Sequence, residues 1–174
     1  KAEIEVSYNL KSNKTKKILG KVEIEYEIYA DGCVEVEAKF IPVAYRRLSA
    51  HMPRFGLTLE MPEEFRNIEY YGMGDCENLS DIYAQSIVGV YNTTVEDMHE
   101  PYIRPQDSGN RGDVRESMLI SDSSKLIFRA DGRNFSFNAN PFTLEQLKKA
   151  KHIEDLPDVE TVYTAVDGFV RGTG

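Results

Sequence analysis

Val22-Glu-Ile-Glu-Tyr-Glu-Ile28 and Val34-Glu-Val-Glu-Ala-Lys-Phe40, joined through Asp31-Gly32, decide the fold class of this chain. Apolar and charged residues alternate with a period of two in both segments, as in strands with one buried and one solvated face. The Asp-Gly dipeptide favours a tight turn between them. The pattern therefore predicts an antiparallel hairpin whose glutamates form a solvated face rather than a metal or catalytic site.

Similar strand patterns recur along the rest of the chain. They predict further strands at 2–8, 55–61, 67–71, 86–91, 114–120, 125–130, 134–138 and 161–166. One helix is predicted, because Thr143-Leu-Glu-Gln146 forms a capping box and the helix should end before Pro157. Many short strands with one short helix predict an all-β fold, a large antiparallel β-sandwich forming a single domain over residues 1–174.

Composition narrows the possible partners. The chain has 174 residues and a net charge of −8, and its lysines and arginines do not gather in one stripe, which argues against nucleic acid. No apolar run approaches the ~20 residues of a membrane span. Cys33 and Cys76 lack metal-site spacing, and the sequence leaves open whether they pair and whether the compartment is cytoplasmic or periplasmic. His51, His99 and His152 are widely spaced and are interpreted as structural, so no metal site is expected. We expect the chain to be an excised piece of a larger protein.

The segment Glu100-Pro-Tyr-Ile-Arg-Pro-Gln-Asp-Ser-Gly-Asn-Arg-Gly-Asp-Val-Arg115 is typical of neither a buried strand nor an amphipathic helix. Its prolines stiffen the backbone, while Gly109 and Gly112 permit positive φ. Planar donors and acceptors on a stiff loop suit a polyhydroxylated ligand. The alternative is a solvated loop held by arginine–carboxylate pairs such as Arg115 with Asp113 or Asp107.

Several segments together resemble the C-terminal domain, or small chain, of bacterial β-galactosidases of glycoside hydrolase family two. The matching stretches, in chain order, are Met52-Pro-Arg-Phe-Gly-Leu57, Tyr70-Tyr-Gly-Met-Gly-Asp-Cys-Glu-Asn-Leu-Ser-Asp81, Pro101–Arg115, Leu147–His152 and Asp167-Gly-Phe169 with Gly172-Thr-Gly174. The first ~50 residues match only in character. Asp75, Leu79, Ile82 and Glu116 depart from the family pattern, as do Val170 and Arg171, which suggests a distant branch.

The resemblance implies a supersandwich of the galactose-mutarotase-like kind. It also implies that both catalytic glutamates, and any Mg²⁺ or Na⁺, belong to a preceding TIM-barrel domain of the same parent chain. Since 174 residues without βα alternation cannot form that barrel, no catalytic residue and no cofactor are expected here. The fragment alone should be inactive, while its parent would hydrolyse β-galactosides and could form a homo-oligomer. A free-standing carbohydrate-binding module and an aldose mutarotase-like domain are the alternatives.

The resemblance also implies candidate site residues. An aromatic residue on the family's last strand stacks on the sugar substrate, and the matching position is Tyr163. The polar residues of the matching loop, Arg104, Gln106, Asn110 and Arg111, are candidate substrate contacts. Arg115, Asp113, Glu77 and Asn78 are expected to support the loop or to dock it against the barrel. Support or docking is also the favoured role for Arg104, Gln106, Asn110 and Arg111.

Overall fold

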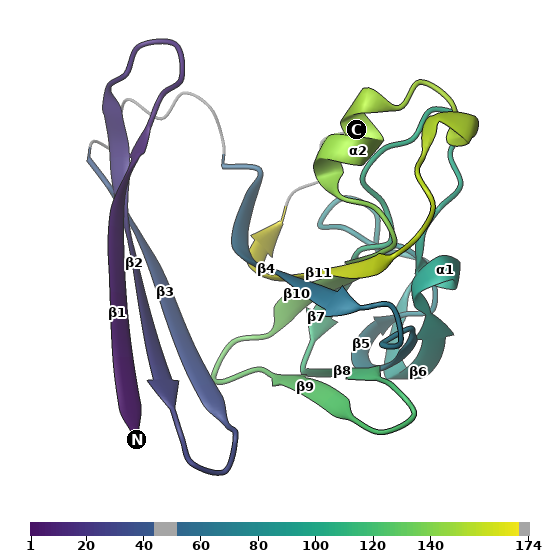
Figure 1. Ribbon diagram of the computed structural model, residues 1–174, viewed down its shortest axis with the longest axis horizontal. Helices are drawn as coiled ribbons and strands as arrows, with labels where there is room; N and C mark the ends of the chain where they lie inside the picture. The colour runs from purple at the N-terminus through teal and green to yellow at the C-terminus, as the bar shows by residue number, and fades with distance from the viewer. Residues whose placement is uncertain (44–51, 171–174) are drawn as a thin grey trace. The chain divides into compact units, whose positions relative to one another are not determined.

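The computed structural model describes residues 1–43 and 52–170, which fall into two compact units, Lys1–His51 and Met52–Gly174. Figure 1 shows the strands and helices of both units. His51, Arg171 and the closing Gly172-Thr-Gly174 lie outside the described residues. The expectation of a single domain over 1–174 stays a prediction.

The first unit is a three-stranded antiparallel sheet in the order β1-β2-β3. Its strands are β1 (Ala2–Lys11), β2 (Ile18–Ile28) and β3 (Val34–Pro42). The predicted hairpin is confirmed, since Val22 faces Phe40 and Ile28 faces Val34. The register gathers apolar side chains on one face and glutamates on the other. Both faces are largely exposed, and Val22 is the one buried hydrophobic residue among residues 1–43.

The second unit contains two four-stranded antiparallel sheets. One has the order β4-β11-β10-β7 and the other β6-β5-β8-β9. Their bounds are β4 Arg54–Pro62, β5 Asn67–Gly74, β6 Ile87–Thr94, β7 Arg111–Val114, β8 Glu116–Ile120, β9 Lys125–Arg129, β10 Phe135–Asn140 and β11 Thr161–Val170. The all-β sandwich prediction is confirmed.

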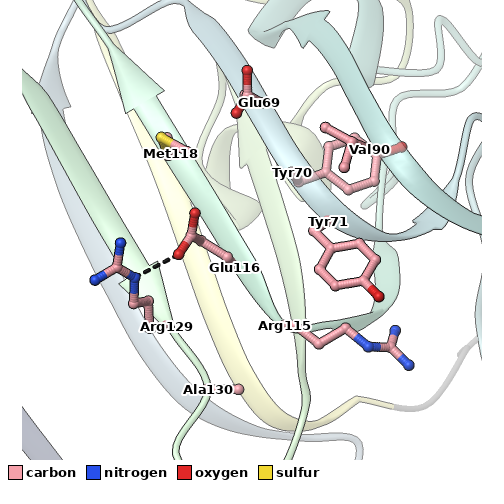
Figure 2. A pocket seen from close by; sticks show the side chains of 9 residues that line it. All are labelled: Glu69, Tyr70, Tyr71, Val90, Arg115, Glu116, Met118, Arg129 and Ala130. Carbon is pink, nitrogen blue, oxygen red and sulfur yellow. Dashed lines mark hydrogen bonds and ion pairs between the residues drawn. The ribbon is translucent and has the colours of Figure 1, made fainter.

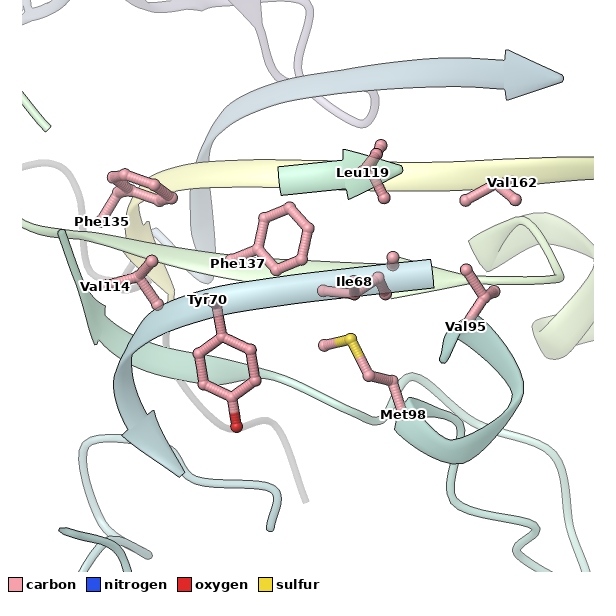
Figure 3. Close-up of a cluster of buried hydrophobic side chains, with 10 residues drawn as sticks. Ile68, Tyr70, Val95, Met98, Val114, Leu119, Phe135, Phe137 and Val162 are labelled. Atoms are coloured by element: carbon pink, nitrogen blue, oxygen red, sulfur yellow. The ribbon is translucent and has the colours of Figure 1, made fainter. Parts of the chain in front are cut away.

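The core of this unit lies between the two sheets (Figure 3). Ile68 and Tyr70 of β5 and Leu119 of β8 come from one sheet, and Phe137 of β10 and Val162 of β11 come from the other. All five side chains are almost completely buried. Burial of their apolar surface is the main force that holds the sheets together.

The described residues also form three short helical turns. The predicted helix is α2 (Leu144–Lys149), and both bonds of its capping box between Thr143 and Gln146 are present. Two turns were not predicted, α1 (Val95–Met98) and the 3-10 turn η1 (Ile153–Asp155). Thr94 caps α1 by accepting a hydrogen bond from the Asp97 backbone. No described helix is long and apolar enough to cross a membrane.

The prediction of one strand over 114–120 is wrong, because the chain changes sheets at Arg115. β7 ends at Val114 and pairs with β10, whereas β8 begins at Glu116 and pairs with β5 and β9. Asp113 has a φ of +53°, so the backbone bends sharply before the transfer. Apolar and polar residues alternate on both sides of such a bend. The alternation therefore did not indicate that the strand is interrupted.

Candidate functional site

Asn78 joins the glycine-rich turn after β5 to the polar loop before β7. Its side-chain amide donates to the carbonyls of Met73 at 3.0 Å and Cys76 at 3.1 Å, and its Oδ1 accepts from the Gly112 backbone at 2.7 Å. Its own backbone exchanges two further bonds with Asn110. Asn78 is 1% exposed, so its polar atoms form these hydrogen bonds with other protein groups rather than with solvent. Its role in the fold is therefore to tie the loop to the turn.

Glu77 makes a second link between the same two segments. Its Oε2 accepts from the Gly109 backbone N–H at 2.5 Å. Burial raises the pKa of the Glu77 carboxyl above its usual range, while this hydrogen bond opposes the shift. Gly109 has a φ of +86°, and a Cβ there would lie 2.3 Å from the Met98 carbonyl oxygen. Only glycine fits this approach.

Arg111 lies beneath the loop. It is 2% exposed, and its Nε donates to the Tyr70 hydroxyl at 3.1 Å. Its Nη1 donates to the carbonyls of Gly109 at 3.1 Å and Asn110 at 3.4 Å. No carboxylate among the described residues forms an ion pair with Arg111.

Arg115 pairs with Asp113 of the same loop, with 2.9 Å between Nη1 and Oδ2. Its guanidinium also lies 5.3 Å from the centre of the Tyr71 ring. Asp113 in turn accepts from the Asn134 amide at 2.6 Å. The arginine–carboxylate pair and the cation–π contact both hold the end of the loop against β5.

Arg104 and Gln106 differ from these residues. Both are exposed and make no hydrogen bond or ion pair within residues 1–43 and 52–170. Asp107, which follows them, lies 3.5 Å from Arg54 and 3.5 Å from the Asn138 amide. The loop thus has an anchored half from Asp107 onward and a half around Arg104 whose polar side chains are available to another surface.

Tyr163 lies on β11, opposite Glu60 of β4 and Asn140 of β10. Its neighbours Val162 and Thr164 are fully buried, whereas Tyr163 is half-buried. Because strand residues alternate between faces, Tyr163 projects from the face opposite the Val162 side chain and is not part of the sandwich core.

Two interactions were missed at the sequence level. Asp167 is 2% exposed and pairs with Arg54 Nε at 2.8 Å. Burial raises the pKa of Asp167 to about 6, against the opposing effect of the Arg54 charge. His99 lies against Ser108 and Asn140, and burial lowers its pKa. Pairings over such long sequence separations leave no local signal.

Two shallow depressions border the loop and its anchors. The first, of about 360 Å³, lies on the outer face of the β6-β5-β8-β9 sheet (Figure 2). Figure 2 shows Tyr71 beside Arg115 at one end and the Glu116–Arg129 pair, 2.5 Å apart, at the other. The second, of about 340 Å³, lies where β5, β6, α1 and Arg111 meet. No cluster of ligating side chains among the described residues could hold a metal ion.

Comparison with known proteins gives a consistent picture. The sequence profile of a family described as "Beta galactosidase small chain" matches residues 1–174. The chain belongs to the β-galactosidase small-chain family. The match includes the first 50 residues, where individual motifs were not recognisable.

Relatives of this small-chain domain are β-galactosidases from several bacteria. The chain is 33% identical to that of Lactococcus lactis over 151 residues, which are 86% of this chain and 14% of that protein. It is 30% identical to that of Streptococcus thermophilus over 154 residues, 88% of this chain and 15% of that protein. The chain thus spans about one seventh of the length of these relatives.

Proposed function

We propose that this domain walls the active-site cleft of a β-galactosidase and supports its multidomain assembly, while the catalytic glutamates lie in a preceding TIM barrel. Family membership and the small share of each relative that the chain covers support this division of labour. Terminal β-galactosides are the substrates of such an enzyme. Any Mg²⁺ or Na⁺ would be held outside this chain.

Tyr163 carries the proposal. A residue that only filled the core would alternate into the sandwich with Val162, but Tyr163 lies on the other face and is half-buried. A tyrosine ring stacks on the C–H face of a pyranose and contributes roughly 1 kcal/mol beyond simple burial. Arg104 and Gln106 would then dock the loop against the barrel, since they have no partners within the described residues.

The test is Tyr163→Ala in the intact enzyme. Loss of the stacking surface should raise KM for lactose about fivefold or more and change KM for a small aryl galactoside less, because the aryl substrate lacks the second sugar. Tyr163→Phe, which keeps the ring, is the matched control and should behave like the wild type. Unchanged KM values for both substrates in Tyr163→Ala would remove Tyr163 from the cleft.

The 174-residue chain by itself should not hydrolyse a chromogenic galactoside. Retaining glycosidases need two carboxyl groups about 5–5.5 Å apart, and this chemistry is assigned to the barrel. Release of nitrophenol by the purified chain, abolished by a substitution within it, would overturn that assignment.

A further inference from the structure

His99 connects three segments of the chain at the end of β10. It directly follows α1 and begins the stretch that leads into the polar loop. Its Nδ1 lies 3.2 Å from the Asn140 amide nitrogen of β10 and 3.4 Å from the Ser108 hydroxyl of the loop. Both partners are buried. We propose that His99 is an acid-sensitive latch: the neutral ring holds the loop against β10, and protonation of the ring releases it.

The orientation of the Asn140 amide fixes the protonation state of His99 in the latched form. The Phe142 backbone N–H donates to Asn140 Oδ1 at 3.0 Å, and only an oxygen can accept there. The other end of the amide is therefore the NH2 group, which donates to His99 Nδ1. A ring nitrogen that accepts a hydrogen bond carries no proton, so the neutral ring holds its proton on Nε2.

Protonation of Nδ1 would place two donors face to face. The Ser108 hydroxyl can rotate and accept from the new N–H, because only one of its two lone pairs is used by the Glu100 backbone N–H at 3.1 Å. The Asn140 amide cannot turn in the same way, since its NH2 group would then face the Phe142 N–H. Buried donors that face each other lose their hydrogen bonds at a cost. The charged ring therefore separates from Asn140, and the loop loses this attachment to β10.

His99 is neutral near pH 7 in the latched form. Burial lowers the pKa of His99, and the Glu100 carboxylate opposes this effect. Among the described residues, Glu100 is the charged group that acts on the ring. The other contacts are uncharged, namely the Asn140 amide, the Ser108 hydroxyl and the Phe142 ring, whose centroid lies 5.4 Å from that of His99. Since a released histidine has the ordinary pKa of about 6.5, acid favours the released form.

The latch lies beside both features of the proposed cleft wall. Asn140 is directly opposite Tyr163 in the register of β10 and β11. Ser108 belongs to the anchored half of the loop, next to the exposed half that carries Arg104. Release of His99 would therefore loosen the surroundings of Tyr163 and of Arg104 together. This consequence for the enzyme rests on the proposed function, whereas the latch itself does not.

The test is NMR of the 174-residue chain between pH 7.5 and 5.0. At pH 7.5 the nitrogen shifts of His99 should place the ring proton on Nε2. As the pH falls below about 6.5, the Glu100 amide, which is bonded to Ser108, should lose hydrogen-exchange protection by up to tenfold per pH unit, after correction for the intrinsic exchange rate. His99→Asn replaces Nδ1 by an oxygen that accepts but does not titrate, and it should keep the protection at pH 5.0. His152→Asn, the same change at an exposed histidine, is the matched control and should respond like the wild type.

Each outcome decides the proposal. A ring proton on Nδ1 at pH 7.5, titration of His99 without a change at Glu100, or an acid response that persists in His99→Asn would overturn the latch. If a thermal melt shows that His99→Asn is unfolded at pH 7.5, the tautomer and the titration of the wild type decide.

The intact enzyme tests the consequence separately. Its KM for lactose should rise on acidification, and His99→Asn should reduce that rise. The same rise in wild type and variant would overturn the control of the cleft by His99. Unchanged KM values in Tyr163→Ala would instead remove the proposed cleft wall and leave the latch standing.

Discussion

Asp167 combines two opposing effects in one side chain. It is paired with Arg54, yet burial dominates and raises its pKa to about 6. In an unfolded chain an aspartate titrates near 4. The folded protein therefore binds the proton of the Asp167 carboxyl more tightly than the unfolded chain does. The free energy of unfolding should fall as the pH rises from about 4 to about 6. Above pH 6, ionisation of the buried Asp167 lowers the free energy of unfolding by about 3 kcal/mol.

Asp167→Asn should remove this dependence. Urea unfolding of both proteins between pH 4.5 and 7.5 measures it as the difference in free energy of unfolding. His99, whose pKa burial lowers, adds an opposite trend below about pH 6.5. That trend is shared by both proteins and cancels in the difference. If the free energy of unfolding depended on pH in the same way for wild type and variant, ionisation of Asp167 would cost the folded protein little stability.

Asn78 tests how far the loop depends on one amide. Asn78→Asp keeps the shape but replaces the donor by an oxygen that faces the carbonyls of Met73 and Cys76. The free energy of unfolding should fall by about 2–4 kcal/mol, because two buried acceptors lose their donor and a charge is buried. Chemical denaturation measures the loss, and the exposed Asn67→Asp is the control. A loss below about 0.5 kcal/mol would mean that the loop is held elsewhere.

At the scale of elements, local sequence patterns predict some of the structure, whereas the rest is determined by contacts between distant segments. The Asp31-Gly32 hairpin and the capped helix at Thr143 depend on neighbours within a few residues, and both are confirmed. The transfer between sheets at Arg115 depends on which strands lie on either side, and the single-strand prediction failed there. The same limit applies to the site. Asn78 could be named as a loop support, but its specific bonds to Asn110 and Gly112 and the Tyr70 hydroxyl that accepts from Arg111 could not.

The acidic face of the first sheet makes its own prediction. Glu25 lies directly opposite Glu5 on β1 and Glu37 on β3, and neither Glu5 nor Glu25 forms an ion pair among the described residues. Like charges in such a position are destabilising. Glu25→Lys should stabilise the sheet by roughly 0.5–1 kcal/mol, seen as a higher melting temperature.

Salt dependence identifies the cause. The gain in stability from Glu25→Lys should shrink in 1 M salt. The Debye length falls to about 3 Å at that concentration, and interactions between exposed charges are then largely screened. Glu64→Lys makes the same charge change at an exposed position outside the sheets and should give little gain. Equal gains from both substitutions would point to net charge rather than to the cross-strand arrangement.

At the scale of the whole molecule, burial is distributed unevenly between the two units. The cluster of core residues lies entirely within residues 52–170, whereas Val22 alone is a buried hydrophobic residue in 1–43. A three-stranded sheet needs a covered apolar face for stability in water.

If the chain is divided between His51 and Met52, the piece 52–174 should unfold cooperatively in urea with dispersed amide NMR signals. The piece 1–51 should show neither property, since the strands alone bury too little apolar surface to offset the entropy of ordering them. If 52–174 proved unfolded and the undivided chain folded in one transition, the core between the two sheets would depend on the first 51 residues, and the single-domain prediction would be the correct description.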